Sequence, residues 1–354
     1  MILINEAKPK YTRLDEILEP VLTDVRFARD IVMVIDLKDA IRKFYRPDIT
    51  VDGDPGAAIE EMSADIINII AHYRNYFFKR GGRRTKFFIL YSEEECSDIT
   101  RDFPNYRYDY YQKRFSEDTF KSNIVKKAVF ILSKVAEIIP NVAYINTSDY
   151  DELVYVKRIC EVAEKNRLVF ILSTDYLLYQ CLDDNIFAIT VEGIRSELVT
   201  KNNVMQRITK RDDEFHFSSD LIPFLFTLAG IQKYSIPNIM GFANIRAATI
   251  IENMLKERKI YDCKTFGIPI NFENLDEENK LDATFLLYED ELKEKYELLT
   301  RNSRLIKSSK LIDTKLLDLK KAPPTGTTFL ELNAKIYNRY PLLIELLLKG
   351  EKIY

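Results

Sequence analysis

Two acidic residues follow short apolar runs that are typical of buried parallel strands. Asp36 ends the run 31–35, and Asp175 comes shortly after the run 168–172. Because ligands bind at the carboxyl ends of parallel strands in open α/β sheets, we expect both acids at a ligand-facing edge. Carboxylate oxygens suit a hard cation such as Mg²⁺. Taken alone, the two residues also allow the simpler interpretation that they are ordinary strand-end acids.

A second acidic group, formed by Asp149, Asp151 and Glu152, stands at the start of a predicted helix. Acids at this position bind a cation, or they cap the helix and interact favourably with its dipole. Without their surroundings, these three residues favour the capping interpretation.

Basic residues gather in two segments. The first surrounds the Gly-Gly turn at 81–82, and the second is interleaved with aromatic residues between 106 and 115. Basic side chains mixed with aromatic rings suit phosphate contacts and base stacking. The alternative is that the charges solvate helix faces and the rings pack in the core. The candidate nucleic-acid contacts are Lys79, Arg80, Arg83 and Arg84, followed by Arg107, Lys113, Arg114, Lys126 and Lys127.

Alternating strand and helix patterns must position these residues. Apolar runs predict strands at 31–36, 86–91, 142–146, 168–172 and 186–191. Helical spacing of apolar residues predicts helices at 56–79, 119–138, 150–165 and 177–182. This alternation predicts an α/β fold with a mainly parallel, twisted sheet flanked by helices. After about residue 214 only helical patterns follow, first at 218–229 and 236–256.

The composition disfavours several classes of protein. The chain has four cysteines, widely spaced and without a CxxC pair, so neither a disulfide framework nor a zinc site is expected. Its two histidines leave little supply for histidine-centred chemistry. No apolar run approaches the roughly 20 residues that span a bilayer, and the first residues lack a signal-peptide pattern. The formal charge of −3 still allows a local basic track.

Several segments, taken in order, resemble the motifs of a known family. Residues 173–180 resemble the SxDxDLxQL signature of 5′-nucleases, and 149–153 stand where that family has an EADDL-like acidic cluster. Residues 228–242 look like its helix-hairpin-helix motif, and 34–45 are similar to its opening strand and helix. The chain therefore resembles the 5′-nuclease superfamily over residues 31–255. The resemblance is to the flap-endonuclease and phage 5′-3′ exonuclease type, with a PIN-like fold.

The resemblance implies a metal site with missing ligands. The family hydrolyses phosphodiesters with two divalent ions, Mg²⁺ or Mn²⁺, held by carboxylates. Carried over position by position, the retained catalytic and metal-binding residues are Asp36, Asp149, Asp151, Glu152 and Asp175. Leu177, Ile231 and Tyr234 stand where ligands of the second ion are expected, and Ser92 replaces a further Asp, with the glutamates at 93–95 as alternatives. We therefore expect one ion at most.

The same resemblance implies a division of the chain. Residues 1–213 correspond to a 5′-nuclease-like α/β domain, in which about 92–127 form the arch-like region that a single strand passes. Residues 214–260 correspond to a degenerate helix-hairpin-helix region, where Asn238 and Ala243 replace glycines. Residues 261–354 are expected to form a helical C-terminal extension outside the resemblance.

Three functions fit this pattern, and whether the chain is an enzyme stays open. The first is a degenerate 5′-nuclease that binds DNA with single-stranded or branched 5′ ends, or acts as a scaffold, with weak or no hydrolysis. The second is an active Mg²⁺-dependent 5′-3′ exonuclease or flap endonuclease of a phage replication system. The third is a phage structural or assembly protein whose C-terminal extension docks a protein partner. We expect a cytoplasmic protein without membrane contact, in the host cell or the particle if it is of phage origin.

Overall fold

The computed structural model describes residues 18, 21–22, 30–44, 55–80, 84–91, 119–138, 141–147, 151–163, 167–190, 196–211, 215, 219–238 and 243–258. Five predicted site residues, Arg83, Arg107, Lys113, Arg114 and Asp149, lie outside these ranges. So do most of the predicted arch and the whole of the predicted C-terminal extension. The α/β domain and the segment that follows it are therefore the parts whose arrangement is known.

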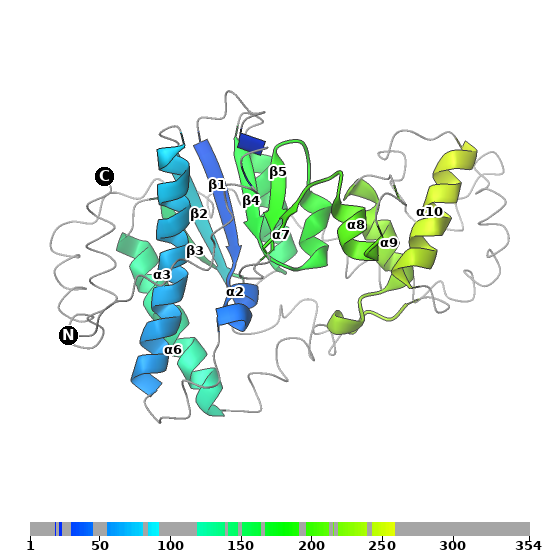
Figure 1. Cartoon of the computed structure of the whole chain (residues 1–354). Helices are drawn as coiled ribbons and strands as arrows, with labels where there is room; N and C mark the ends of the chain where they lie inside the picture. Colours follow the sequence, from blue (N-terminus) through cyan, green and yellow to red (C-terminus); the bar gives the residue numbers. More distant parts are fainter. Residues whose placement is uncertain are drawn as a thin grey trace.

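A mainly parallel sheet forms the centre of the described part of the chain (Figure 1). Its six strands lie in the order β3-β2-β1-β4-β5-β6, and only the β5–β6 pair is antiparallel. The strands are β1 (Asp30–Asp36), β2 (Arg84–Tyr91), β3 (Val142–Asn146), β4 (Leu168–Leu172), β5 (Ile186–Ile189) and β6 (Leu198–Val199). The predicted α/β fold with a mostly parallel sheet is confirmed.

The strand order creates a switch point beside β1. The chain first moves outward from β1 to β2 and β3, and then returns to the other side of β1 with β4. Connections therefore leave the carboxyl ends of β1 and β4 in opposite directions. A crevice opens at such a point in open α/β sheets, and it is the usual place for ligands.

Helices cover both faces of the sheet. Successive side chains of each strand point to opposite faces, so each strand contributes to an apolar core on either side. Ile31, Met33 and Ile35 pack with one group of helices, whereas Val32 and Val34 pack with the other. The first group contains α2 (Leu37–Phe44), α3 (Pro55–Lys79) and α6 (Thr119–Ile138). The second contains α7 (Glu152–Val162), η3 (Tyr176–Cys181), α8 (Val204–Thr209), η5 (Ser219–Leu221), α9 (Ile222–Ala229), η6 (Gln232–Tyr234) and α10 (Asn244–Arg258).

The helices that follow the sheet continue its second core rather than forming a separate one. Residues of α8, α9 and α10 belong to the same apolar cluster as β4 and α7. Figure 1 shows these helices beyond β5, on the side of the sheet away from α3 and α6. None of the helices in the described ranges is both long and apolar enough to cross a bilayer.

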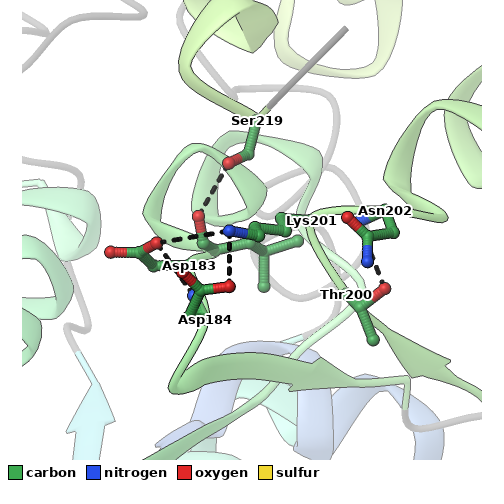
Figure 2. A network of polar contacts seen from close by, with 7 residues as sticks. Asp183, Asp184, Thr200, Lys201, Asn202 and Ser219 are labelled. Atoms are coloured by element: carbon green, nitrogen blue, oxygen red, sulfur yellow. Dashed lines mark hydrogen bonds and ion pairs between the residues drawn. The ribbon is translucent and has the colours of Figure 1, made fainter. Parts of the chain in front are cut away.

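A polar network ties the turn before β5 to the segments that follow β6 (Figure 2). The ammonium of Lys201 pairs with the carboxylates of Asp183 and Asp184, and the Ser219 hydroxyl donates to the carbonyl of Leu182 at 2.7 Å. Both acids are exposed, so the ion pairs contribute little to stability. The network lies at the amino end of β5, opposite the edge at which Asp36 ends β1.

The structure differs from the sequence predictions on both sides of β5. The strand β6 and the helix α8 were not predicted, because two residues of strand and six of helix carry too little periodicity. The predicted helix at 236–256 is wrong at its start: Ile236 pairs with Ile231 in an isolated bridge, and α10 begins at Asn244. The predicted helix at 177–182 is a 3₁₀ helix, η3.

Candidate active site at the carboxyl edge of the sheet

Strands β1 and β4 bring the best-supported acids together. The register pairs Ile35 with Leu172, so Asp36 lies at the level where β4 gives way to Ser173, Thr174 and Asp175. This is the carboxyl edge at the switch point. The side chains of Asp36, Ser173 and Asp175 are all at least 99% buried.

The hydroxyl of Ser173 connects the two acids. It donates to Oδ2 of Asp36 at 2.7 Å and accepts the backbone N–H of Asp175 at 3.0 Å. Asp175 in turn caps η3, because its Oδ1 accepts the N–H of Leu177 at 2.8 Å. The acids that sequence reasoning placed at strand ends thus share one hydrogen-bonded group.

A further acid, Asp39, belongs to this group and was not predicted. Its carboxylate accepts the N–H of Thr174 at 2.7 Å and the Thr174 hydroxyl at 2.7 Å. Its own N–H donates to Oδ1 of Asp36 at 3.1 Å. The only sequence signal is the spacing of three residues from Asp36, which reads as an ordinary acid in the first turn of a helix.

The electrostatics of Asp36 follow from this crowding. Its pKa is raised from 3.8 to about 6; burial is the largest cause, and the nearby charges of Asp39 and Asp175 act in the same direction. The hydrogen bonds from Ser173 and from the Asp39 N–H oppose the rise. Burial dominates because a carboxylate loses its hydration shell when it leaves water.

The acids at the start of α7 lie at the same edge but have other partners. Asp151 is the N-cap of the helix, and its Oδ1 accepts the N–H of Leu153 at 2.9 Å. Glu152 is buried and lies beside Lys38, whose Nζ is 4.0 Å from Oε1 of Glu152. The capping interpretation therefore describes what Asp151 does in this structure, and Lys38 is a second residue that sequence reasoning missed.

The positions at which the resemblance expects ligands for a second ion are part of the core. Leu177, Ile231 and Tyr234 are all buried, and they belong to the apolar cluster that joins β4, α7 and α9. An apolar or phenolic side chain in such surroundings offers no carboxylate to a hard cation.

Four of the described acids at this edge accept hydrogen bonds from the protein. Within the part of the chain that the structure describes, no three Asp, Glu, His or Cys side chains are placed to hold an ion together. Asp36 and Asp39 each accept hydrogen bonds at both carboxylate oxygens, and Asp151 and Asp175 cap helices.

The predicted nucleic-acid contacts that the structure describes lie in two places. Lys79, Arg80 and Arg84 are exposed. In the backbone register of β1 and β2, Arg84 lies opposite Asp30, the first residue of β1. Since β1 rises about 20 Å between Asp30 and Asp36, this cluster is at the opposite edge from the acids. Lys126 and Lys127 are exposed on α6.

Removing the bridging hydroxyl should be costly. In a Ser173→Ala variant, Asp36 loses its donor at 2.7 Å and the Asp175 N–H loses its acceptor. We expect the free energy of unfolding at pH 7.5 to fall by about 2 kcal/mol, since a buried charged group loses a hydrogen bond. Urea unfolding measures this, with Ser133→Ala as the matched control because Ser133 bonds only its own helix, at an exposed site. Equal losses in both variants would contradict the bridging role.

Comparison with solved structures identifies the fold. The phage T5 D15 protein co-crystallised with metal ions matches with a TM-score of 0.51 and 15% identity, over 92% of this chain and 99% of that one. The T5 5′-exonuclease with bound zinc matches with a TM-score of 0.51 and 14% identity, over 88% and 100%. A variant of the D15 flap endonuclease in a pseudo-enzyme-product complex with DNA and metal ions matches with a TM-score of 0.51 and 15% identity, over 91% and 100%.

These likenesses confirm the sequence-based identification at the level of the fold: the chain has the fold of the 5′-nuclease superfamily. No protein-family model and no curated protein matches the chain.

Proposed function

We propose that this protein is a degenerate 5′-nuclease that binds DNA with single-stranded or branched 5′ ends and hydrolyses it weakly or not at all. The observation that carries the proposal is the burial of Leu177, Ile231 and Tyr234 in the core. Two-metal hydrolysis needs one ion to activate water and a second to stabilise the leaving oxygen. A site without carboxylates at the second position has no means to hold the second ion.

The arrangement of the other acids supports the same conclusion. Asp36 is 1% exposed and its pKa is raised to about 6, and the Ser173 hydroxyl and the Asp39 N–H already donate to its two oxygens. We propose Asp36, Asp149, Asp151, Glu152 and Asp175 as the remnant of a two-ion site, which in this chain holds one Mg²⁺ or Mn²⁺ at most.

DNA binding is separable from hydrolysis. A variant of the T5 D15 flap endonuclease, a protein similar in fold to this chain, was solved in a pseudo-enzyme-product complex with DNA and metal ions. Phosphate contacts need basic side chains rather than bound metal. In this chain Lys126 and Lys127 are exposed on α6, at the end of the predicted arch. We propose this lysine pair, with the basic residues of the arch, as the contact to the single strand.

The test is an assay of binding and cleavage on one labelled 5′-flap DNA with Mg²⁺ or Mn²⁺. We expect binding by fluorescence anisotropy and no cleavage above that of an Asp175→Ala variant, which corrects for contaminating nuclease. Affinity should fall with salt. A Lys126→Ala/Lys127→Ala variant should reduce the slope of log K against log salt by about 2, since each lysine contributes about one phosphate contact.

The control for charge is Lys126→Arg/Lys127→Arg, which should keep the slope. Metal-dependent cleavage that Asp175→Ala abolishes would overturn the proposal and establish an active 5′-3′ exonuclease or flap endonuclease. Absence of DNA binding at low salt would overturn it as well, and would point to the structural or assembly function.

A further inference from the structure

Lys38 occupies an unusual position among the acids of the carboxyl edge. It lies in the first turn of α2, between Asp36 and Asp39 in the sequence. Its side chain is 11% exposed, and its ammonium lies 4.0 Å from the carboxylate of Glu152, which is 4% exposed. The pair joins α2, which follows β1, to the first turn of α7, which follows β3.

Several buried carboxylates gather at the carboxyl edge, and Lys38 is in contact with one of them, Glu152. Asp36, Asp39 and Asp175 are each 1% exposed, and Glu152 is nearly as buried. Burying carboxylates is costly unless opposite charge and hydrogen-bond donors accompany them. Ser173, Thr174 and backbone N–H groups supply donors to three of the acids, but these groups carry no net charge.

We propose that Lys38 is a built-in cation of this edge: its ammonium supplies, next to Glu152, positive charge that a divalent ion would otherwise bring. The inference rests on the proposed function, because an edge that serves no hydrolysis can exchange a dissociable metal for a tethered charge. An ammonium is a compact point charge with three donors, and it adapts to carboxylates at variable distance. Its positive charge also repels a divalent cation from the carboxylate of Glu152.

The proposal is tested by two variants of the full chain, measured with MgCl₂ or MnCl₂ as the only added metal. Lys38→Met removes the charge and keeps the length of the side chain, and Lys38→Arg keeps the charge. In EDTA, we expect Lys38→Met to lower the Tm by roughly 5 °C, because a buried acid loses a nearby cation. Millimolar Mg²⁺ should restore much of this loss, and calorimetry should show Mg²⁺ binding at least about tenfold tighter than in the wild type.

Wild type and Lys38→Arg should show no rise in Tm with Mg²⁺. A matched control is Lys201→Met, since Lys201 pairs with exposed acids at the opposite edge of the sheet. That variant should not gain a response to Mg²⁺. The proposal is overturned if Lys38→Met responds to Mg²⁺ no more than the wild type does, or if the wild type itself binds Mg²⁺ equally tightly.

A second comparison covers the case in which Lys38→Met does not fold. The double variant Lys38→Met/Glu152→Gln removes both charges. It should therefore fold, and its Tm should be higher than that of the single variant. A double variant no more stable than Lys38→Met overturns the proposal. Cleavage of the flap substrate by the wild type would instead overturn the proposed function, and it leaves the Lys38 measurements as a separate result.

Discussion

Replacing Gly230 by alanine is expected to lower the free energy of unfolding by roughly 3–5 kcal/mol. Gly230 ends α9 with φ 64° and ψ 179°, a conformation that is almost restricted to glycine. A Cβ at this position would lie 2.5 Å from the carbonyl oxygen of Ile236 and 2.5 Å from the carbonyl carbon of Pro237. Both contacts are with backbone atoms, which cannot rotate away as the end of a side chain does.

The measurement is urea unfolding followed by far-UV circular dichroism. Ser235→Gly is the matched control, because Ser235 lies in the same turn with φ 58° and already accepts a positive φ. Glycine there should change stability by less than about 1 kcal/mol, and in the stabilising direction. A Gly230→Ala variant as stable as the wild type would show that the turn moves freely.

This glycine explains what the helix-hairpin-helix-like region retains. The turn brings Ile231 and Ile236 into a bridge with N–H to O distances of 2.8 and 3.2 Å. It also directs Ile231 and Tyr234 into the core. The Gly and the Ile-Pro of the motif therefore serve the packing of the chain, a role that needs no metal and no phosphate. The aspartates that the resemblance expects at positions 231 and 234 would have no such role, which fits the apolar and aromatic residues found there.

The sequence predicts the strands β3 and β4 well because the signal is local and strong. The runs 142–146 and 168–172 coincide with them, since each is a short, mostly apolar segment, and every residue of β4 is buried. The strand β6 has two residues, and its existence depends on pairing with β5. Short elements of this kind are specified by contacts between segments, which a pattern along the chain does not contain.

The site shows the same division between local and distant causes. Asp36 and Asp175 are predictable because each ends a recognisable strand, and parallel strands share one edge. Asp39 and Lys38 are not, since their importance arises from Thr174 and Glu152, more than a hundred residues away. The burial of these groups, and with it the raised pKa of Asp36, follows only once α2 and α7 are seen to pack at this edge.

Asp36→Asn is expected to stabilise the protein above pH 6 and to change it little below pH 4. The pKa of Asp36 is about 6 in the folded protein, against an ordinary value of 3.8. Between these values the folded state holds a proton that the unfolded state has released, so the wild type loses stability as pH rises through this window. The difference corresponds to about 3 kcal/mol of unfavourable interaction once Asp36 is ionised. Asparagine is never ionised. Its side-chain amide still offers one acceptor and one donor, which can bond the Asp39 N–H and the Ser173 hydroxyl oxygen.

The measurement is the free energy of unfolding of both proteins in urea at several values of pH between 4 and 8. The advantage of the asparagine variant should grow through the window and level off near pH 7. Asp183→Asn controls for loss of a carboxylate, because Asp183 is exposed and pays no cost of burial. Its difference from the wild type should show no such growth. An Asp36→Asn variant that is equally destabilised at pH 4 and pH 8 would mean that Asp36 acts only through its hydrogen bonds. The crowding of acids at this edge would then impose no electrostatic cost on the folded state.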